Sequence, residues 1–240
     1  NSIENQGKLT VSDCTISGND SSGIYNTEGS ISLTVNNSTI SGNSAVNGSG
    51  IYNSSSSLTI NDSTISGNTS SGNGGGIYNA SGSATISNST ISDNASLNGG
   101  GIYNTESGKI TINNSRISGN KSSSSSYYSY GGGIYNESGS VAINSSTISG
   151  NTSSSSSYSS GGGIYNESGS VAINSSTISG NTSSSSSGGG IYNKSGSATI
   201  NNSTISANTS SRDGGGIYSG GKLSIVWSLV IARAQVQRFI

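Results

Sequence analysis

The sequence predicts an all-β protein, a parallel β-helix of about nine coils that each hold three strands in about 26 residues. A word close to "GIYN" recurs at a regular period, and each period contains further short words in which apolar and polar residues alternate. The composition agrees, because only 28% of the residues are hydrophobic and 8% are charged. Stacked repeats bury a continuous thin core that no single repeat could bury alone.

The first word sets the period. Ile3 in "SIEN" reads as a degenerate first copy. The isoleucines of the eight clear copies are Ile24, Ile51, Ile77, Ile102, Ile134, Ile164, Ile191 and Ile217. One whole unit, "GGGIYNESGSVAINSSTISGNTSSSSS", runs from Gly131 to Ser157 and recurs unchanged from Gly161 to Ser187. A fold that accepts an identical copy is one in which another unit adds length and little else.

Two more words complete each unit. The second is an apolar–polar–apolar triplet such as Leu33–Val35, and the third is "STISGN" or a near copy. Both alternate with period two and are rich in β-branched residues, which indicates strands. Runs of Gly, Asn and Ser between the words predict turns. The unit length varies mainly between the "ISGN" asparagine and the next "GG", so we expect one variable turn along one edge of the rod.

Asparagine recurs at two positions of the unit. An asparagine at a bend tolerates unusual backbone angles, and stacked amides can bond to one another. We therefore interpret both series as structural ladders. The "GIYN" series is Asn26, Asn53, Asn79, Asn104, Asn136, Asn166 and Asn193, and the "ISGN" series is Asn19, Asn43, Asn68, Asn94, Asn120, Asn151, Asn181 and Asn208.

Several functional classes are disfavoured by the composition. The net charge is −1 with no basic stripe, so no nucleic-acid partner is expected. There is no histidine, and the ten acids are scattered, so we expect no catalytic residue, no metal, no cofactor and no enzyme activity. No apolar run reaches the roughly 20 residues of a transmembrane segment. Cys14 cannot form an intrachain disulfide, and we expect it to be buried because it aligns with Ser38 and Ser63.

The pairing of "GGGIYN" with "ISGN" resembles the repeats of polymorphic outer-membrane-protein, autotransporter-type adhesins. Those repeats combine GGA and an aliphatic residue with F-x-x-N; here a third glycine replaces the alanine and isoleucine replaces the phenylalanine. The resemblance covers about residues 2–222. It implies a right-handed parallel β-helix of the pectate-lyase-like type, located outside the cell or on its surface, that serves as an adhesin, a stalk or a self-assembling fibre subunit.

The tyrosines form the candidate contact surface. If isoleucine faces inward in "GIYN", the adjacent tyrosine faces outward, and a stripe of such rings could stack on sugar rings of glycans, on other cell-surface ligands or on another rod. The alternative is that the tyrosines only stack on one another and stiffen the sheet. The ladder is Tyr25, Tyr52, Tyr78, Tyr103, Tyr135, Tyr165, Tyr192 and Tyr218, and the serine-rich loops add Tyr127, Tyr128, Tyr130 and Tyr158.

The C-terminal end has a different character. We assign residues 1–225 to the β-helix repeats and residues 226–240 to an atypical apolar segment, either a cap or a head-to-tail joint with another copy of the chain. A helix and an extended strand both fit its pattern. The residues expected to carry this role are Trp227, Leu229, Ile231, Val236, Phe239 and Ile240.

Two other functions remain open. A β-helix that acts on polysaccharide would need two acids facing one groove, a gathering that the sequence does not suggest. An ice-binding protein would use the outward Thr-x-Ser array of the "TIS" words, although Arg116 interrupts it. Thermal hysteresis would support the second alternative.

Overall fold

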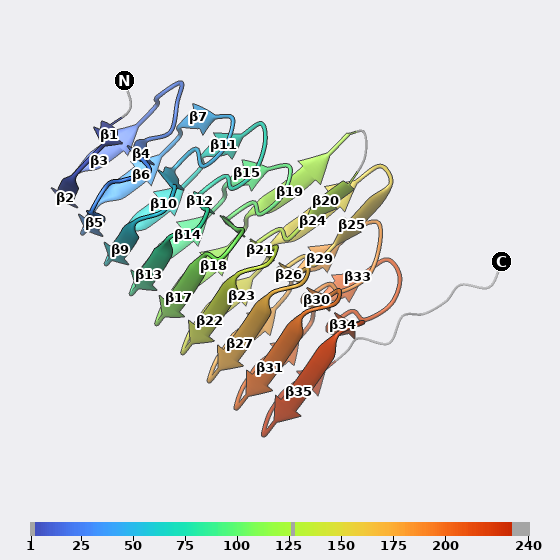
Figure 1. Cartoon of the computed structure of the whole chain (residues 1–240). Coiled ribbons are helices and arrows are strands. Elements are labelled where there is room, and N and C mark those ends of the chain that lie inside the picture. The colour runs from blue at the N-terminus through green and yellow to red at the C-terminus, as the bar shows by residue number, and fades with distance from the viewer. Residues whose placement is uncertain (1–2, 126–127, 232–240) are drawn as a thin grey trace.

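The chain winds into a rod of stacked coils in this computed structural model, which describes residues 3–125 and 128–231. The N-terminal coil (blue) and the C-terminal coil (red) lie at opposite ends of the rod (Figure 1). Three nine-stranded sheets run along its length, and each strand pairs in parallel with its equivalent in the next coil. The prediction of an all-β parallel β-solenoid of about nine turns of about 26 residues is confirmed.

The first sheet is built from the "GIYN" words, and each of the nine coils contributes one strand to it. Its strands are β1 (Ile3–Asn5), β4 (Ile24–Asn26), β8 (Ile51–Asn53), β12 (Ile77–Asn79), β16 (Ile102–Asn104), β21 (Ile134–Asn136), β26 (Ile164–Asn166), β30 (Ile191–Asn193) and β34 (Ile217–Ser219).

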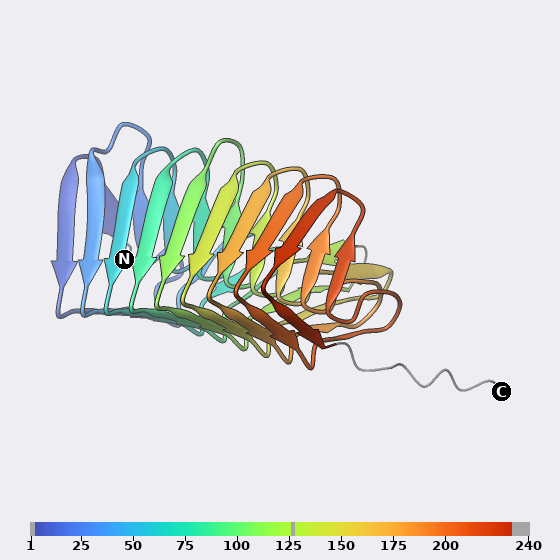
Figure 2. The same ribbon diagram turned by 90° about the horizontal axis from the view of Figure 1, so that it is seen from below.

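The second and third sheets are built from the other two words, and Figure 2 shows neighbouring strands side by side along the rod. The strands of the second sheet are β2 (Lys8–Ser12), β5 (Ser32–Asn36), β9 (Ser57–Asn61), β13 (Ser83–Ser87), β17 (Lys109–Asn113), β22 (Ser140–Asn144), β27 (Ser170–Asn174), β31 (Ser197–Asn201) and β35 (Lys222–Val226). Those of the third are β3 (Thr15–Ser17), β6 (Thr39–Ser41), β10 (Thr64–Ser66), β14 (Thr90–Ser92), β18 (Arg116–Ser118), β23 (Thr147–Ser149), β28 (Thr177–Ser179), β32 (Thr204–Ser206) and β36 (Leu229–Ile231).

The core is a set of aliphatic columns. Register places isoleucine on isoleucine, as in Ile77 on Ile102 in the first sheet and Ile65 on Ile91 in the third. These side chains are at most 1% exposed. Alternation along each strand points every second side chain outward, which puts the tyrosine of "IYN" on the outer face.

The corner between the second and third sheets is made by one residue in the left-handed region. Asn37, Asp62 and Asn88 occupy this corner position with φ of 45–50°, and residues with such short polar side chains tolerate this conformation. Trp227 takes the same position in the ninth coil with φ of 49°. The corner is therefore a property of the repeat that persists where the favoured residue is lost.

A fourth sheet lies where the sequence predicted only a variable turn. Once the main strands stack, the segments after the "ISGN" asparagines run beside each other at the same spacing, so their backbone groups pair. The fourth sheet contains β7 (Ser44–Ala45), β11 (Thr69–Ser70), β15 (Ala95–Ser96), β19 (Lys121–Ser124), β24 (Thr152–Ser155), β29 (Thr182–Ser183) and β33 (Thr209–Ser210), and the two longest loops add the pair β20 (Tyr128–Tyr130) and β25 (Tyr158–Ser160).

Cys14 is exposed, so the expectation that it is buried was wrong. Its equivalents in later coils, such as Ser38 and Ser63, are 5% and 4% exposed. Burial at this position comes from the coil stacked on the N-terminal side, and in the described part of the chain no coil precedes the first.

The ninth coil continues to Ile231. β35 and β36 pair in register with β31 and β32, so the first residues of the apolar segment are strands of the solenoid. Leu229 and Ile231 stand opposite Thr204 and Ser206, the outward positions expected from the sequence. Val236, Phe239 and Ile240 lie outside the described residues. Within residues 3–125 and 128–231, no helix is long and apolar enough to cross a membrane.

Candidate contact surface

The eight tyrosines of the first sheet stack into one continuous ladder. Neighbouring ring centroids are 4.8 Å apart for Tyr25 and Tyr52, and 5.2 Å apart for Tyr78 and Tyr103. The rings are within 17° of parallel in each of these pairs. The coil spacing of a parallel sheet imposes this distance, which suits offset stacking of aromatic rings. The tyrosines therefore stack on one another, an arrangement compatible with both a stiffening role and a contact surface.

Exposure of the ladder changes along the rod. Tyr25 is 40% exposed, whereas Tyr103, Tyr135 and Tyr165 are 8%, 6% and 3% exposed. Tyr130 from the longest loop covers the middle of the ladder, with its ring 4.5 Å from that of Tyr165 and 6.2 Å from that of Tyr135. The central tyrosines thus form a small satellite core, and the rings towards the ends stay more open.

The loop tyrosines supply exposed aromatic surface above this covered stretch. Tyr128 and Tyr158 are 52% and 43% exposed, and their ring centroids are 6.0 Å apart. The guanidinium of Arg212 lies 5.0 Å from the centroid of the Tyr158 ring, in cation–π geometry. Tyr127 lies outside the described residues.

Two carboxylates flank the middle of the ladder and are satisfied there. Glu137 accepts hydrogen bonds from the hydroxyls of Tyr103, at 3.0 Å, and Thr105. Glu167 accepts from the Tyr135 hydroxyl and from the Lys194 ammonium, at 2.7 Å. These are intramolecular contacts that hold the outer face of the first sheet.

Burial governs the pKa values of the covered tyrosines. Burial and, after it, the neighbouring carboxylates raise the pKa of Tyr103, Tyr135 and Tyr165 far above the usual value. Burial together with Tyr128 raises the pKa of Tyr130 to about 12. Burial alone would also raise the pKa of Glu167, but the hydrogen bonds from Lys194 and Tyr135 outweigh it and the net pKa is lowered. The covered tyrosines are therefore neutral throughout the physiological range.

Both asparagine series form ladders inside the rod. The asparagines from Asn26 to Asn193 in the first series are fully buried. From Asn26 to Asn166, each Nδ2 donates to the Oδ1 of the next coil over 2.6–2.8 Å, and Asn193 donates to the Ser219 hydroxyl instead. In the second series, both the backbone N–H and the Nδ2 of an asparagine donate to the Oδ1 of the asparagine one coil later, as in Asn94 to Asn120. The structural interpretation of the asparagines is supported, and these amides are not available to a ligand.

A third ladder was missed from the sequence. The serine before each "TIS" word accepts a hydrogen bond from the backbone N–H of the equivalent residue one coil earlier, over 3.0–3.1 Å, as in Ser63 to Ser89 and Ser89 to Ser115. Its hydroxyl donates to the carbonyl two residues before it, as Ser89 does to Ser87. The available signal was the recurrence of this serine in every unit after the first, where Cys14 takes its place.

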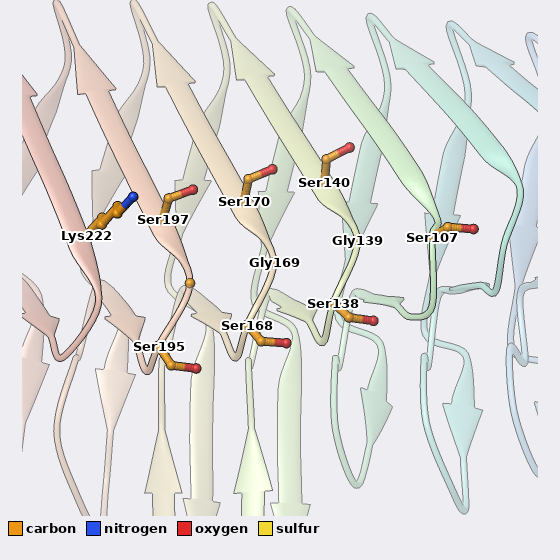
Figure 3. A pocket seen from close by; sticks show the side chains of 11 residues that line it. Ser107, Ser138, Gly139, Ser140, Ser168, Gly169, Ser170, Ser195, Ser197 and Lys222 are labelled. Carbon is orange, nitrogen blue, oxygen red and sulfur yellow. The ribbon is translucent and has the colours of Figure 1, made fainter.

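A shallow groove of about 540 Å³ follows the corner between the first and second sheets (Figure 3). Serines flank a row of glycines there, and Lys222 stands at one end. The outer hydroxyls bond to the preceding coil, as Ser168 does to the carbonyl of Glu137. Gly169 has no room for a side chain, because a Cβ would lie 2.2 Å from the Gly139 carbonyl oxygen. The groove is a result of close coil packing.

The described part of the chain offers no metal site and an interrupted ice-binding array. No group of three or more His, Cys, Asp or Glu side chains within it could hold a metal ion. The outward Thr-x-Ser positions of the third sheet do align, but Arg116 and Leu229 replace threonine in two of the strands.

The fold and this surface define a repeat protein of the parallel β-solenoid class. Residues 62–80, 145–167, 175–194 and 202–220 match the repeat of the Chlamydia polymorphic membrane protein. The chain therefore contains Chlamydia polymorphic membrane protein repeats in a parallel β-solenoid, as the resemblance implied. Each match runs from the left-handed corner through the third sheet to the next "GIY" strand.

These repeats are typical of non-catalytic surface proteins, and proteins of that family are membrane or surface associated. Comparisons with curated proteins and with solved structures gave no significant match.

Proposed function

We propose that this chain is a non-catalytic adhesive rod, located outside the cell or on its surface, that presents aromatic side chains to glycans or other cell-surface ligands. The observation that carries the proposal is the uneven exposure of the tyrosines. Open rings occur at Tyr25 and at the loop residues Tyr128 and Tyr158, while the central rings are covered. Exposed aromatic surface on a rigid support suits stacking on sugar rings.

The test compares two sets of substitutions in an attachment assay. Replacing Tyr25, Tyr128 and Tyr158 by serine is expected to lower attachment of the chain to glycan-coated surfaces by about tenfold or more. A control with outward Thr59, Thr85 and Thr111 replaced by serine changes a different face and is expected to attach normally. Unchanged attachment of the tyrosine variant, with its circular dichroism intact, would contradict the contact role.

End-to-end assembly is a second candidate, supported by the ninth coil. Leu223, Ile225 and Leu229 are 41–55% exposed there, and Trp227 is 92% exposed. The three strands of this coil have a pairing partner on one side only. Apolar, unpaired strand edges favour association with another chain. Electron microscopy over a range of protein concentrations would test this role. Single rods, each the length of one chain and separate at every concentration, would exclude it.

The absence of catalysis is also part of the proposal. It is supported by the repeat type and by the use of Glu137 and Glu167 in internal hydrogen bonds. Incubation of the purified chain with pectin and related glycans should leave them intact. Release of shorter saccharides would instead establish the polysaccharide-acting alternative.

A further inference from the structure

A cavity of about 440 Å³ opens on the outer face of the first sheet at the N-terminal end of the tyrosine ladder. Glu4 of β1, Tyr25 of β4 and Tyr52 of β8 form one wall. The opposite wall comes from the turns that follow the third sheet, with Asp20 in the first and Val46 in the second. Aromatic rings and carboxylates thus line one open hollow, and a concave site with a few convergent polar groups is a candidate binding site.

The ladder ends in this cavity. β1 pairs with β4 in register, so that Glu4 takes the place that a tyrosine occupies in every later coil. Tyr25 is therefore stacked on Tyr52 on one side, at 4.8 Å, and has a carboxylate rather than a ring as its neighbour on the other side. The face of an aromatic ring is electron-rich and attracts cations.

The carboxylates of the cavity have no cationic partner among the residues that the structure describes. Glu4 accepts a hydrogen bond of 2.6 Å from the neutral amide of Gln6. The ion pair recorded within the described ranges joins Lys194 to Glu167, so neither Glu4 nor Asp20 takes part in one there. Of the two acids beside the middle of the ladder, Glu167 is thus paired with a cation and Glu137 accepts from two hydroxyls, whereas Glu4 and Asp20 have no ion-pair partner within the described ranges.

We propose that this cavity binds a cation of the alkylammonium or guanidinium type, the group carried by a lysine or arginine side chain of a partner protein. Both kinds of contact already occur inside the chain. The Lys194 ammonium bonds to Glu167 beside the ladder, and the Arg212 guanidinium lies over the Tyr158 ring. The inference builds on the contact role proposed for the tyrosines and adds the chemistry of one partner group.

The test titrates the full 240-residue chain with n-butylammonium chloride and with n-pentanol, a neutral molecule of similar shape. With tyrosine rings labelled for NMR, the ammonium is expected to shift the signals of Tyr25 and Tyr52 saturably, and the alcohol is not. Glu4→Gln combined with Asp20→Asn should weaken the ammonium affinity by about tenfold or more. The matched control, Asp13→Asn with Glu28→Gln, removes the same charge from outside the cavity and should leave the affinity within about twofold.

Three results would overturn the inference: equal shifts with the alcohol, unchanged affinity in the Glu4 and Asp20 variant, or an equal loss in the control. All four positions are exposed, so circular dichroism should show the same fold in every variant. The measurement uses no cell or glycan surface. Ammonium binding without attachment would therefore contradict the adhesive role alone, and attachment without ammonium binding would contradict this inference alone.

Discussion

The asparagine and tyrosine ladders occupy adjacent positions of the same strands and behave differently. Inside, Asn26 and Asn193 are both fully buried and make the same bond in every coil between them. Outside, exposure falls from 40% at Tyr25 to 3% at Tyr165. An inner asparagine contacts the neighbouring coils, which place another asparagine against it, whereas an outer position also depends on what the loops place over it. The inner ladder is thus the same in each of these coils, whereas the exposure of the outer ladder differs from coil to coil.

The largest effect is expected from the inner ladder. Asn120→Ala removes the oxygen that accepts from both nitrogens of Asn94 and the donor to Asn151. Several buried polar groups lose their partners, each at about 1–3 kcal/mol, so the free energy of unfolding should fall by about 3–5 kcal/mol.

The control is the outward, half-exposed Asn113, which water can replace as a partner of Asn144. Asn113→Ala should cost less than about 1 kcal/mol in denaturant titrations. Similar losses of unfolding free energy for Asn120→Ala and Asn113→Ala would contradict the stronger role of the inner ladder.

The covered and open tyrosines should differ next. Tyr135→Ser loses two stacked neighbours, a hydrogen bond to Glu167 and nearly all of the ring's burial, so we expect a loss of about 3 kcal/mol. Tyr25→Ser should cost less than about 1 kcal/mol, because this ring is open. Thermal and denaturant unfolding would measure both, and a larger loss at Tyr25 would contradict the covering role of the loop.

Alkaline pH should weaken the covered part of the ladder by a smaller, gradual effect. A pKa raised in the folded state means that the unfolded chain releases protons first, so the stabilisation is complete below pH 10 and is lost as pH rises through the folded pKa. For Tyr130 this window extends from about 10 to about 12, and it continues upward for Tyr135. Tyrosinate absorbance should therefore rise in two steps, with the second accompanying unfolding. A single step near pH 10 would contradict the burial.

The smallest effect is expected at the exposed ion pair. Lys194→Gln removes a partner of Glu167 that is itself 52% exposed, so the loss should be at most about 0.5 kcal/mol and should shrink with added salt. The pKa of Glu167 should rise, because Lys194 contributes to lowering it. Its stabilisation is present above the pKa of the unfolded state and is lost as pH falls through the folded pKa. An NMR titration of Glu167 in both chains would show whether the pKa moves as expected.

The sequence predicted most of the features that repeat from coil to coil along the rod. Period, strands, isoleucine columns and asparagine ladders all repeat, so eight copies made the pattern plain. It failed where a position depends on its neighbours in space. Tyr130, from the loop before β21, packs on Tyr165, and the exposure of Cys14 follows from its place in the first coil. The fourth sheet arises from the stacking of the coils, since its strands of two to four residues show no apolar–polar alternation.

The asparagine amides also give the rod a direction. In both inner ladders an Nδ2 donates to the Oδ1 of the asparagine one coil later, as in Asn79 to Asn104 and Asn120 to Asn151. The outer asparagines of the second sheet donate in the opposite direction, as in Asn144 to Asn113, so their amide dipoles oppose those of the inner ladders. The amide bonds inside the rod nevertheless run in one direction along it. A chain of such rods joined head to tail would keep one polarity along its whole length, whereas a tail-to-tail pair would set donor against donor.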